Sequence, residues 1–220
     1  VTNESGCVSP ASGNVVINTQ PAAPTANAGR GGNVCGLNYK FSAIVSFGTG
    51  VWTQTTGPGT STFIPDKNTP DATVTVSAYG DYTYTWTETN NACTSSSRIN
   101  VNFYEQPAAN AGKGGNNCGL EFILGATPGI GKGTWTLVNG PGTATFSPNA
   151  NTPNAKVTVS SYGSHTFQWT EVNGICSNSS AVSINFIRQS SANAGNGGDE
   201  CDKDFILKAV PGAVPGIWTK

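Results

Sequence analysis

The chain repeats itself at an interval of 83 residues, and this repeat constrains the fold more than any other feature. The tetrapeptide Ala-Asn-Ala-Gly begins at Ala26, Ala109 and Ala192. The same interval separates three cysteines and three Trp-Thr pairs, which are Cys35, Cys118 and Cys201, and Trp52, Trp135 and Trp218. Chance does not hold so many landmarks in one register, so we interpret the chain as an array of one small domain type.

The landmarks divide the chain into four segments. We expect the C-terminal tail of one repeat, two complete repeats, and the N-terminal head of a following repeat. These are residues 1–25, 26–108, 109–191 and 192–220. The tail is recognised because Cys7 lies 86 residues before Cys93, with the three extra residues in the linker. The chain therefore reads as a stretch of a longer array.

Within one repeat the apolar side chains alternate with polar ones, which is the period of a β-strand. Tyr82, Tyr84 and Trp86 share one face of such a run, and turn signals such as Gly-Pro-Gly at 57–59 separate the runs. No stretch has a helical period. About seven short strands in 83 residues predict an all-β fold of tandem Ig-like, two-sheet β-sandwich repeats.

The charge balance and the lengths of the apolar runs argue against a nucleic-acid partner and a transmembrane segment. Charged residues are 10% of the chain, and 11 basic residues face 12 acidic ones, which leaves a net charge of -1. A nucleic-acid binder needs a concentrated basic face, so we expect no nucleic-acid partner. No apolar run approaches the roughly 18 residues that span a bilayer, so this stretch predicts no transmembrane segment.

Two sequence runs carry a resemblance to a known family. The runs Trp52–Gly59 and Tyr79–Asn90 resemble PKD-type Ig-like repeats. Together with the Ala-Asn-Ala-Gly openings and the paired cysteines, they resemble the PKD-like repeats of large Bacteroidota surface proteins, the SprB-like gliding-motility adhesins. The resemblance implies type IX secretion, an extracellular location on the cell surface, and work with the secretion and motility machinery of the outer membrane. The implied partner is a surface polysaccharide or an abiotic surface.

Six cysteines without a metal-type CxxC spacing indicate disulfides formed in an oxidising, extracellular compartment. In an Ig-like sandwich Cys35 and Cys93 fall at opposite poles, roughly 25 Å apart, which is too far for a disulfide. Successive domains bring the two poles together, so our first choice is an inter-domain bond between Cys35 and Cys176. The alternative pairs Cys35 with Cys93, and Cys118 with Cys176, within each repeat.

The sequence shows no catalytic constellation, so we expect no enzyme and no cofactor. The single histidine, His165, takes the place of Tyr82 in the preceding repeat. Glu88 and Glu171 are the only acids kept at the repeat interval in the complete domains, and one carboxylate per repeat is too few for a glycosidase pair or a calcium site. The acidic cluster of the final segment predicts at most a weak calcium site, near Asp199, Glu200 and Asp202.

The remaining question is whether the tryptophans are core or binding residues. An Ig sandwich buries a tryptophan on a central strand, so we expect four of them in the cores: Trp52, Trp86, Trp135 and Trp169. The first functional hypothesis is a structural and adhesive stalk of a secreted surface adhesin. The alternative is a set of carbohydrate-binding accessory repeats of a secreted polysaccharide-processing protein, which requires exposed aromatic side chains repeated every 83 residues.

Overall fold

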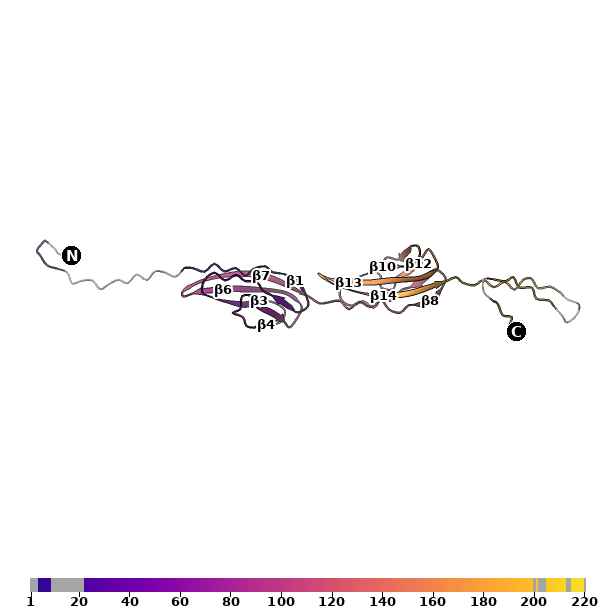
Figure 1. Ribbon diagram of the computed structural model, residues 1–220, viewed down its shortest axis with the longest axis horizontal. Coiled ribbons are helices and arrows are strands. Elements are labelled where there is room, and N and C mark those ends of the chain that lie inside the picture. The colour runs from indigo at the N-terminus through magenta and orange to yellow at the C-terminus, as the bar shows by residue number, and fades with distance from the viewer. Residues whose placement is uncertain (1–3, 9–21, 200, 202–204, 213–214, 220) are drawn as a thin grey trace. The chain divides into compact units, whose positions relative to one another are not determined.

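The computed structural model describes residues 4–8, 22–199, 201, 205–212 and 215–219 (Figure 1). The regular structure in these residues consists of fourteen β-strands, and no helix occurs among them. In this part of the chain there is accordingly no helix long and apolar enough to cross a bilayer. The predicted all-β class is confirmed.

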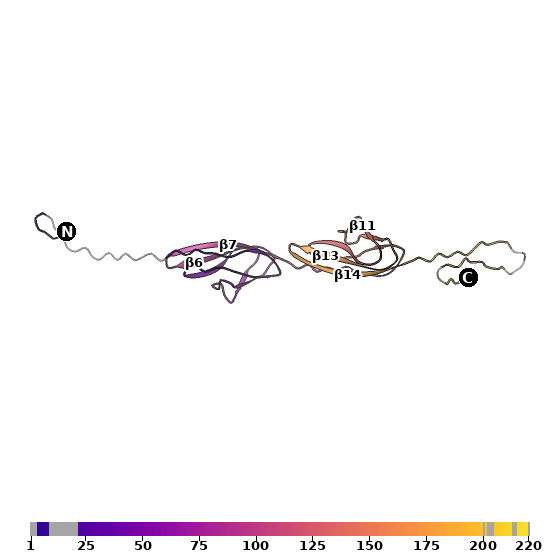
Figure 2. The same cartoon turned by 45° about the horizontal axis from the view of Figure 1, so that its top comes forward.

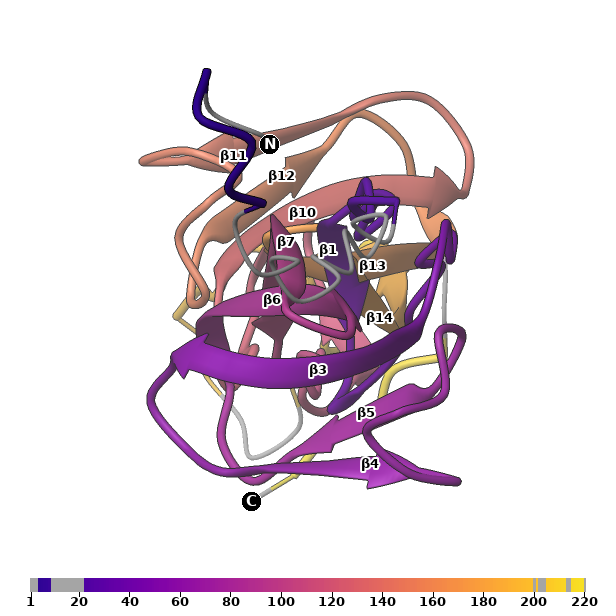
Figure 3. The same cartoon turned by 90° about the vertical axis from the view of Figure 1, so that its left-hand side faces the viewer.

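The first complete repeat forms two sheets from seven strands. These are β1 Gly32–Cys35, β2 Asn38–Lys40, β3 Thr49–Thr56, β4 Ser61–Ile64, β5 Thr73–Val76, β6 Gly80–Asn90 and β7 Cys93–Tyr104. One sheet has the order β1-β7-β6-β3 and the other the order β2-β5-β4. Figure 3 shows β3 in one layer and β4 and β5 in the other.

The second repeat has the same architecture. Its strands are β8 Gly115–Cys118, β9 Glu121–Ile123, β10 Lys132–Asn139, β11 Ala144–Ser147, β12 Lys156–Val159, β13 Gly163–Asn173 and β14 Cys176–Ile187. The sheets run β10-β13-β14-β8 and β11-β12-β9, and Figure 2 shows β11 apart from β13 and β14. The first strand, β8, pairs with the last, β14, in parallel.

The chain divides into two compact units. The first contains Val1–Gly32 and Leu37–Phe103, and the second contains Asn33–Gly36 and Tyr104–Lys220. The end of β1 therefore belongs with the second unit. The predicted segment boundaries at residues 26, 109 and 192 remain predictions, although each set of seven strands lies inside one predicted repeat.

The alternation along β6 explains how each core is built. Tyr82, Tyr84 and Trp86 are all buried. Trp52 of β3 lies opposite Trp86, with the two rings 5.2 Å apart between centroids, and Trp135 and Trp169 repeat this pair at 5.2 Å. The strand that carries Trp52 is at the edge of its sheet, which corrects the expected central position. The side chain is buried nevertheless because it points between the two sheets.

The Ala-Asn-Ala-Gly tetrapeptide has a structural cause. The Asn27 side-chain oxygen accepts a hydrogen bond from the Gly29 amide at 2.9 Å, and Ala28 is buried between them. Gly29 has a φ of 75°, and a Cβ there would lie 2.3 Å from the Ser42 carbonyl oxygen. Only glycine fits this turn. The motif recurs because every repeat needs the same entry turn.

Candidate functional site at the Cys35–Cys176 disulfide

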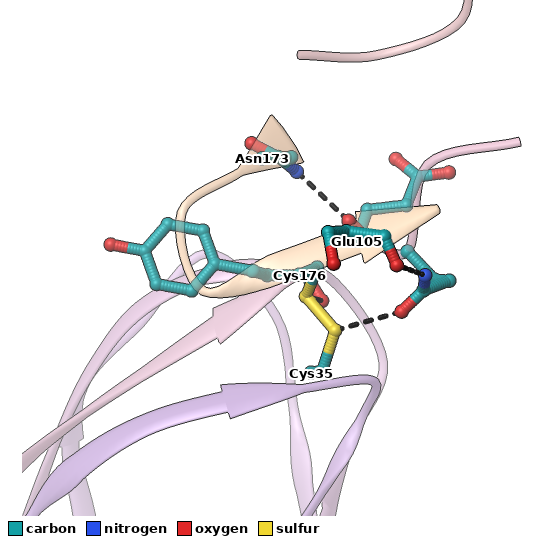
Figure 4. Close-up of a disulfide and its surroundings, with 7 residues drawn as sticks. Cys35, Glu105, Asn173 and Cys176 are labelled. Carbon is teal, nitrogen blue, oxygen red and sulfur yellow. Dashed lines mark hydrogen bonds between the residues drawn. A yellow bond between two sulfur atoms is a disulfide. The ribbon is translucent and has the colours of Figure 1, made fainter. Parts of the chain in front are cut away.

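One disulfide joins residues of the two complete repeats. Cys35, the last residue of β1, is bonded to Cys176, the first residue of β14, with their Cα atoms 5.4 Å apart (Figure 4). This separation is ordinary for a disulfide. It is the pairing that the argument from opposite poles favoured. The alternative pairs, Cys35 with Cys93 and Cys118 with Cys176, are incompatible with it because each uses a cysteine of this bond.

Two tight backbone turns present the sulfur atoms. After Cys35 the chain turns at Gly36, which has a φ of 102° and whose amide donates to the Tyr104 carbonyl at 2.9 Å. On the other side, Cys176 follows the hairpin turn at Gly174, where φ is 60°. Positive φ values favour glycine at both positions. The local sequence thus fixes where each cysteine points.

Side chains from the linker and the hairpin surround the bond, and we call residues 33–36, 104–106 and 173–177 the junction. The Asn173 amide donates to the Glu105 carbonyl at 2.9 Å, and the Gln106 amide donates to the Ser177 carbonyl at 2.7 Å. The Gln106 side-chain oxygen also touches the Cys35 sulfur at 2.9 Å. A disulfide sulfur has no hydrogen, so this last contact is not a hydrogen bond. Hydrogen bonds from side-chain amides to main-chain carbonyl groups therefore hold the junction in addition to the covalent bond.

An aromatic ring closes the junction against the hairpin turn. A Cβ built on Gly174 would lie 2.3 Å from Cδ1 of Tyr104, so the tyrosine ring packs directly on the glycine backbone. Position 174 requires glycine for two reasons: its φ is positive, and the Tyr104 ring leaves no space for a Cβ atom. The contact between Tyr104 and the turn adds packing to the polar contacts.

One hydrogen bond of the junction has a counterpart at each of the two other repeat ends. The Asn90 amide donates to the Ala22 carbonyl at 2.9 Å, as Asn173 does to Glu105. The Gly119 amide donates to the Ile187 carbonyl at 3.0 Å, as Gly36 does to Tyr104. Cys118 ends β8 just as Cys35 ends β1, and it is exposed. Two elements of the junction, the hairpin asparagine and the glycine after the first strand, therefore recur at the other repeat ends.

The two repeated carboxylates lie in the cores. Glu88 and Glu171 are 0% and 1% exposed, and each accepts a hydrogen bond from a tryptophan indole, Trp86 or Trp169, at 2.9 Å. Each also accepts backbone hydrogen bonds from the loop before the third strand of its repeat. These donors are Ser46 and Phe47 in the first repeat and Gly129 in the second. The glutamates thus anchor a loop to the core.

The hydrogen bonds around Glu88 decide its charge. Burial raises the pKa of its carboxyl group, whereas hydrogen bonds from the Ser46 hydroxyl, the Trp86 indole and the backbone amides of Ser46 and Phe47 lower it. The net pKa lies below its ordinary value, so Glu88 is a buried carboxylate stabilised by donors and not by a cation. Sequence reasoning noticed the repeated glutamates but did not find this role. Their retention at the repeat interval was the available signal.

The tryptophans and the histidine are core residues. Trp52, Trp86, Trp135 and Trp169 are each at most 1% exposed. His165 is also buried, with Nε2 2.9 Å from the Pro141 carbonyl oxygen and its ring against Phe167 and Phe186. Its surroundings are those of a packed aromatic residue.

The acidic cluster of the final segment falls mostly outside the described residues. Asp199 is exposed, whereas Glu200 and Asp202 are not described, so the weak calcium site remains a prediction. Within the described residues no group of three histidine, cysteine or acidic side chains is placed to hold a metal ion. The repeat tail at residues 1–25 is described only at residues 4–8 and 22–25.

Comparisons with known proteins identify a fold. No family model matches the chain, and no curated protein matches it. Among solved structures, extracellular domains 3–5 of Drosophila OTK superpose with a TM-score of 0.52 at 12% identity. That match covers 75% of this chain and 60% of the OTK chain, so the present chain spans less than two thirds of its length.

Two further solved structures are similar. A three-Ig segment of titin gives a TM-score of 0.41 at 16% identity, covering 78% of this chain and 70% of that one. The PKD domain from the KIAA 1837 protein gives 0.35 at 22% identity, covering 43% of this chain and 100% of that one. The OTK match, taken with the two sandwiches described above, shows the fold: the chain is a tandem array of Ig-like β-sandwich repeats.

Proposed function

We propose that the chain is the structural and adhesive repeat region of a secreted, extracellular surface protein, a multi-domain stalk of the kind found in Bacteroidota gliding adhesins. The observation that carries the proposal is the junction, in which a disulfide and hydrogen bonds from side-chain amides to main-chain carbonyls connect residues of one predicted repeat with residues of the next. A structural disulfide also favours an oxidising, extracellular compartment. The proposal also includes type IX secretion and interaction with the motility machinery of the outer membrane, and both of these points rest on the sequence resemblance.

The chemistry of the repeats supports a non-enzymatic role. The repeated acids, the histidine and the four paired tryptophans are all buried in the sandwiches. Threonine, serine and asparagine cover the outer strand positions, as in Thr83, Thr87 and Ser96 of the β6–β7 pair. Such a face carries little charge of its own, so it suits neutral polysaccharide or an abiotic surface. Weak contacts on successive repeats would add through avidity.

Binding by the whole chain tests the adhesive part. The 220-residue chain is applied to a bacterial-surface polysaccharide, a plant polysaccharide and bare glass, and bound protein is measured against concentration. Saturable binding to one or more of them supports adhesion by these repeats. Absence of binding to all three contradicts it. Antibody labelling of intact producing cells tests the location, and labelling only after lysis contradicts a surface protein.

A second candidate function, carbohydrate-binding accessory repeats, is favoured by one pair of residues. Tyr79 and Tyr162 are 83 residues apart and both are 38% exposed. Arg188 lies over the ring of Tyr162, 5.4 Å from its centroid, so a sugar would have to displace the guanidinium to stack on that face. Exposed tyrosine rings at the repeat interval are what this hypothesis requires, since flat aromatic faces stack on apolar ligand surfaces.

Replacing these tyrosines separates the two candidates. If the chain consists of carbohydrate-binding accessory repeats, the double variant Tyr79→Ala, Tyr162→Ala should bind polysaccharide at least tenfold more weakly, because stacking is lost. Phe47→Ala is the matched control, since Phe47 is 54% exposed without an aromatic counterpart at the repeat interval. Unchanged binding by the double variant supports the adhesive stalk instead. The readout is the half-saturating protein concentration on each polysaccharide.

A further inference from the structure

The disulfide changes which part of the chain carries tension when its two ends are pulled apart. We propose that the Cys35–Cys176 bond is a tension bypass, which removes residues 36–175 from the path along which force travels. The inference concerns the mechanics of this chain and does not depend on which surface the repeats bind. It uses the connectivity of the bond and the strands on either side of it.

The covalent path through the bond is short. From the N-terminal side, force runs along β1 to Cys35, crosses the two sulfur atoms, and continues from Cys176 along β14 to Ile187. The bonded cysteines are 141 positions apart in the sequence. A fully extended stretch of that length would measure about 480 Å, at roughly 3.4 Å per residue. The bond closes this length into a loop that tension does not reach.

The closed loop contains nearly all of both sandwiches. Every strand from β2 to β13 lies in it, and only β1 and β14 lie on the path. The paired tryptophans and the anchoring glutamates lie in it as well, which are Trp52, Trp86, Trp135, Trp169, Glu88 and Glu171. Pulling the ends therefore leaves the aromatic pairs of both cores without load.

The two strands on the path have little length to release. A β-strand rises about 3.3 Å per residue, which is close to the limit of an extended chain. β14 is also held on both sides, in register with β13 through eleven residue pairs and with β8 through four. Tension along β14 consequently acts on a strand that is already extended and is enclosed by its neighbours. The bypass makes the stretch from β1 to β14 nearly inextensible while the bond is intact.

The junction contacts shield one of the two sulfur atoms of the bond that the bypass needs. Cys176 is 1% exposed, and the Tyr104 carbonyl oxygen lies 3.6 Å from its sulfur. Gln106 spans the bond, with its oxygen on the Cys35 sulfur and its amide on the Ser177 carbonyl. An attacking thiolate has to reach one of these sulfur atoms to break the bond, so the cover limits attack at Cys176, whereas Cys35 is exposed and is the side open to exchange.

Single-molecule force spectroscopy on the full 220-residue chain tests the bypass. Handles are attached to the two ends without cysteine chemistry, and peptide mapping verifies the Cys35–Cys176 bond beforehand. We expect the oxidised chain to release about 480 Å less length than the chain after reduction, at forces that unfold Ig-like domains. A variant with Cys35→Ser and Cys176→Ser should extend like the reduced chain with or without reductant.

Matched variants make the outcome specific. Cys118→Ser should keep the short extension of the wild type, because Cys118 is exposed and takes no part in this bond. Equal release by the oxidised chain and the double variant, with the bond verified, overturns the proposal. So does mapping that finds Cys35 bonded to Cys93, in which case Cys35→Ser lengthens the chain by only about 195 Å. The force experiment uses no ligand, so a negative result in it does not affect the adhesion proposal. A negative result in the surface-binding experiment likewise does not affect the tension bypass.

Discussion

Glu88 shows how one buried side chain organises a loop in the first repeat. Its carboxylate takes hydrogen bonds from the Trp86 indole and from the backbone amides of Ser46 and Phe47, and it is fully buried. A buried charge is costly unless donors surround it. The donors supplied by the loop therefore bind the loop and the carboxylate to each other, and neither is well placed without the other.

Replacing Glu88 by glutamine should destabilise the first repeat by about 1–3 kcal/mol, because the new amide group faces donors where an acceptor is needed. The measurement is urea unfolding of the whole chain followed by tryptophan fluorescence. Asp81→Asn is the control, since Asp81 is an exposed acid on the same strand. An unfolding curve for Glu88→Gln that overlies the wild type would contradict the anchoring role.

The lowered pKa of Glu88 predicts a dependence of stability on pH. Unfolding returns the carboxyl group to its ordinary pKa of about 4.5, which is higher than its value in the folded chain. The unfolded state then binds more protons, so the stabilisation is complete above pH 4.5 and is lost as the pH falls through the folded pKa. Urea midpoints of wild type between pH 6 and pH 3 should fall more steeply than those of Glu88→Gln. Parallel curves would show that Glu88 does not contribute.

At the scale of strands, each sandwich depends on a glycine beside a tryptophan. Gly50 of β3 and Gly133 of β10 occupy equivalent positions, and a Cβ on either would lie 1.8 Å from the ring of Trp86 or Trp169. The rings are buried and in contact with a second tryptophan, so they have no room to move away. The pairing of the third and sixth strands of each repeat is thus possible only with glycine at this place.

Gly50→Ala should accordingly destabilise the first repeat by about 1–3 kcal/mol through overpacking of the core. Gly32→Ala is the matched control, because nothing lies within 4 Å of a Cβ on Gly32 of β1 and its φ is not positive. Thermal unfolding followed by near-ultraviolet circular dichroism reports on the tryptophan environment. Equal midpoints for the two variants would contradict the close contact with Trp86.

At the scale of the whole molecule, the disulfide covalently joins a residue of the first predicted repeat to a residue of the second. Its loop of 141 positions is long, and closing a long loop removes much of the entropy of the unfolded chain. Reduction should therefore lower the free energy of unfolding by about 2–5 kcal/mol. Urea curves with and without reductant test this, with the Cys35→Ser and Cys176→Ser variant expected to be insensitive to reductant. A wild type that is equally insensitive would contradict it.

Thiol labelling gives an independent check of the pairing. A maleimide applied to the folded chain should label Cys118 and Cys201, which are exposed, and should leave Cys35 and Cys176 unlabelled until reductant is added. Mass spectrometry of the digested chain identifies the labelled peptides. Labelling of Cys176 without reduction would contradict the bond.

The sequence by itself determined the repeat, the strand pattern and the burial of the paired tryptophans, because these follow from periodicity. A side chain two positions along a strand faces the same way, so Tyr82, Tyr84 and Trp86 had to share one face. The argument against a Cys35–Cys93 bond combined the Ig-like topology that the strand pattern predicts with strand length and the reach of a disulfide. Periodicity, length and covalent geometry are local quantities, and a single sequence contains them.

Only the tertiary structure decided how the junction is held and what the repeated glutamates do. Asn173 and Gln106 contact carbonyl groups that lie 68 and 71 positions away, and such contacts depend on where the folded chain places its backbone. Glu88 was visible as a repeated acid, but its partners in the loop became apparent only once strand and loop were brought together. Hydrogen bonds act over about 3 Å, so residues distant in sequence are joined by them only after the fold has set their positions.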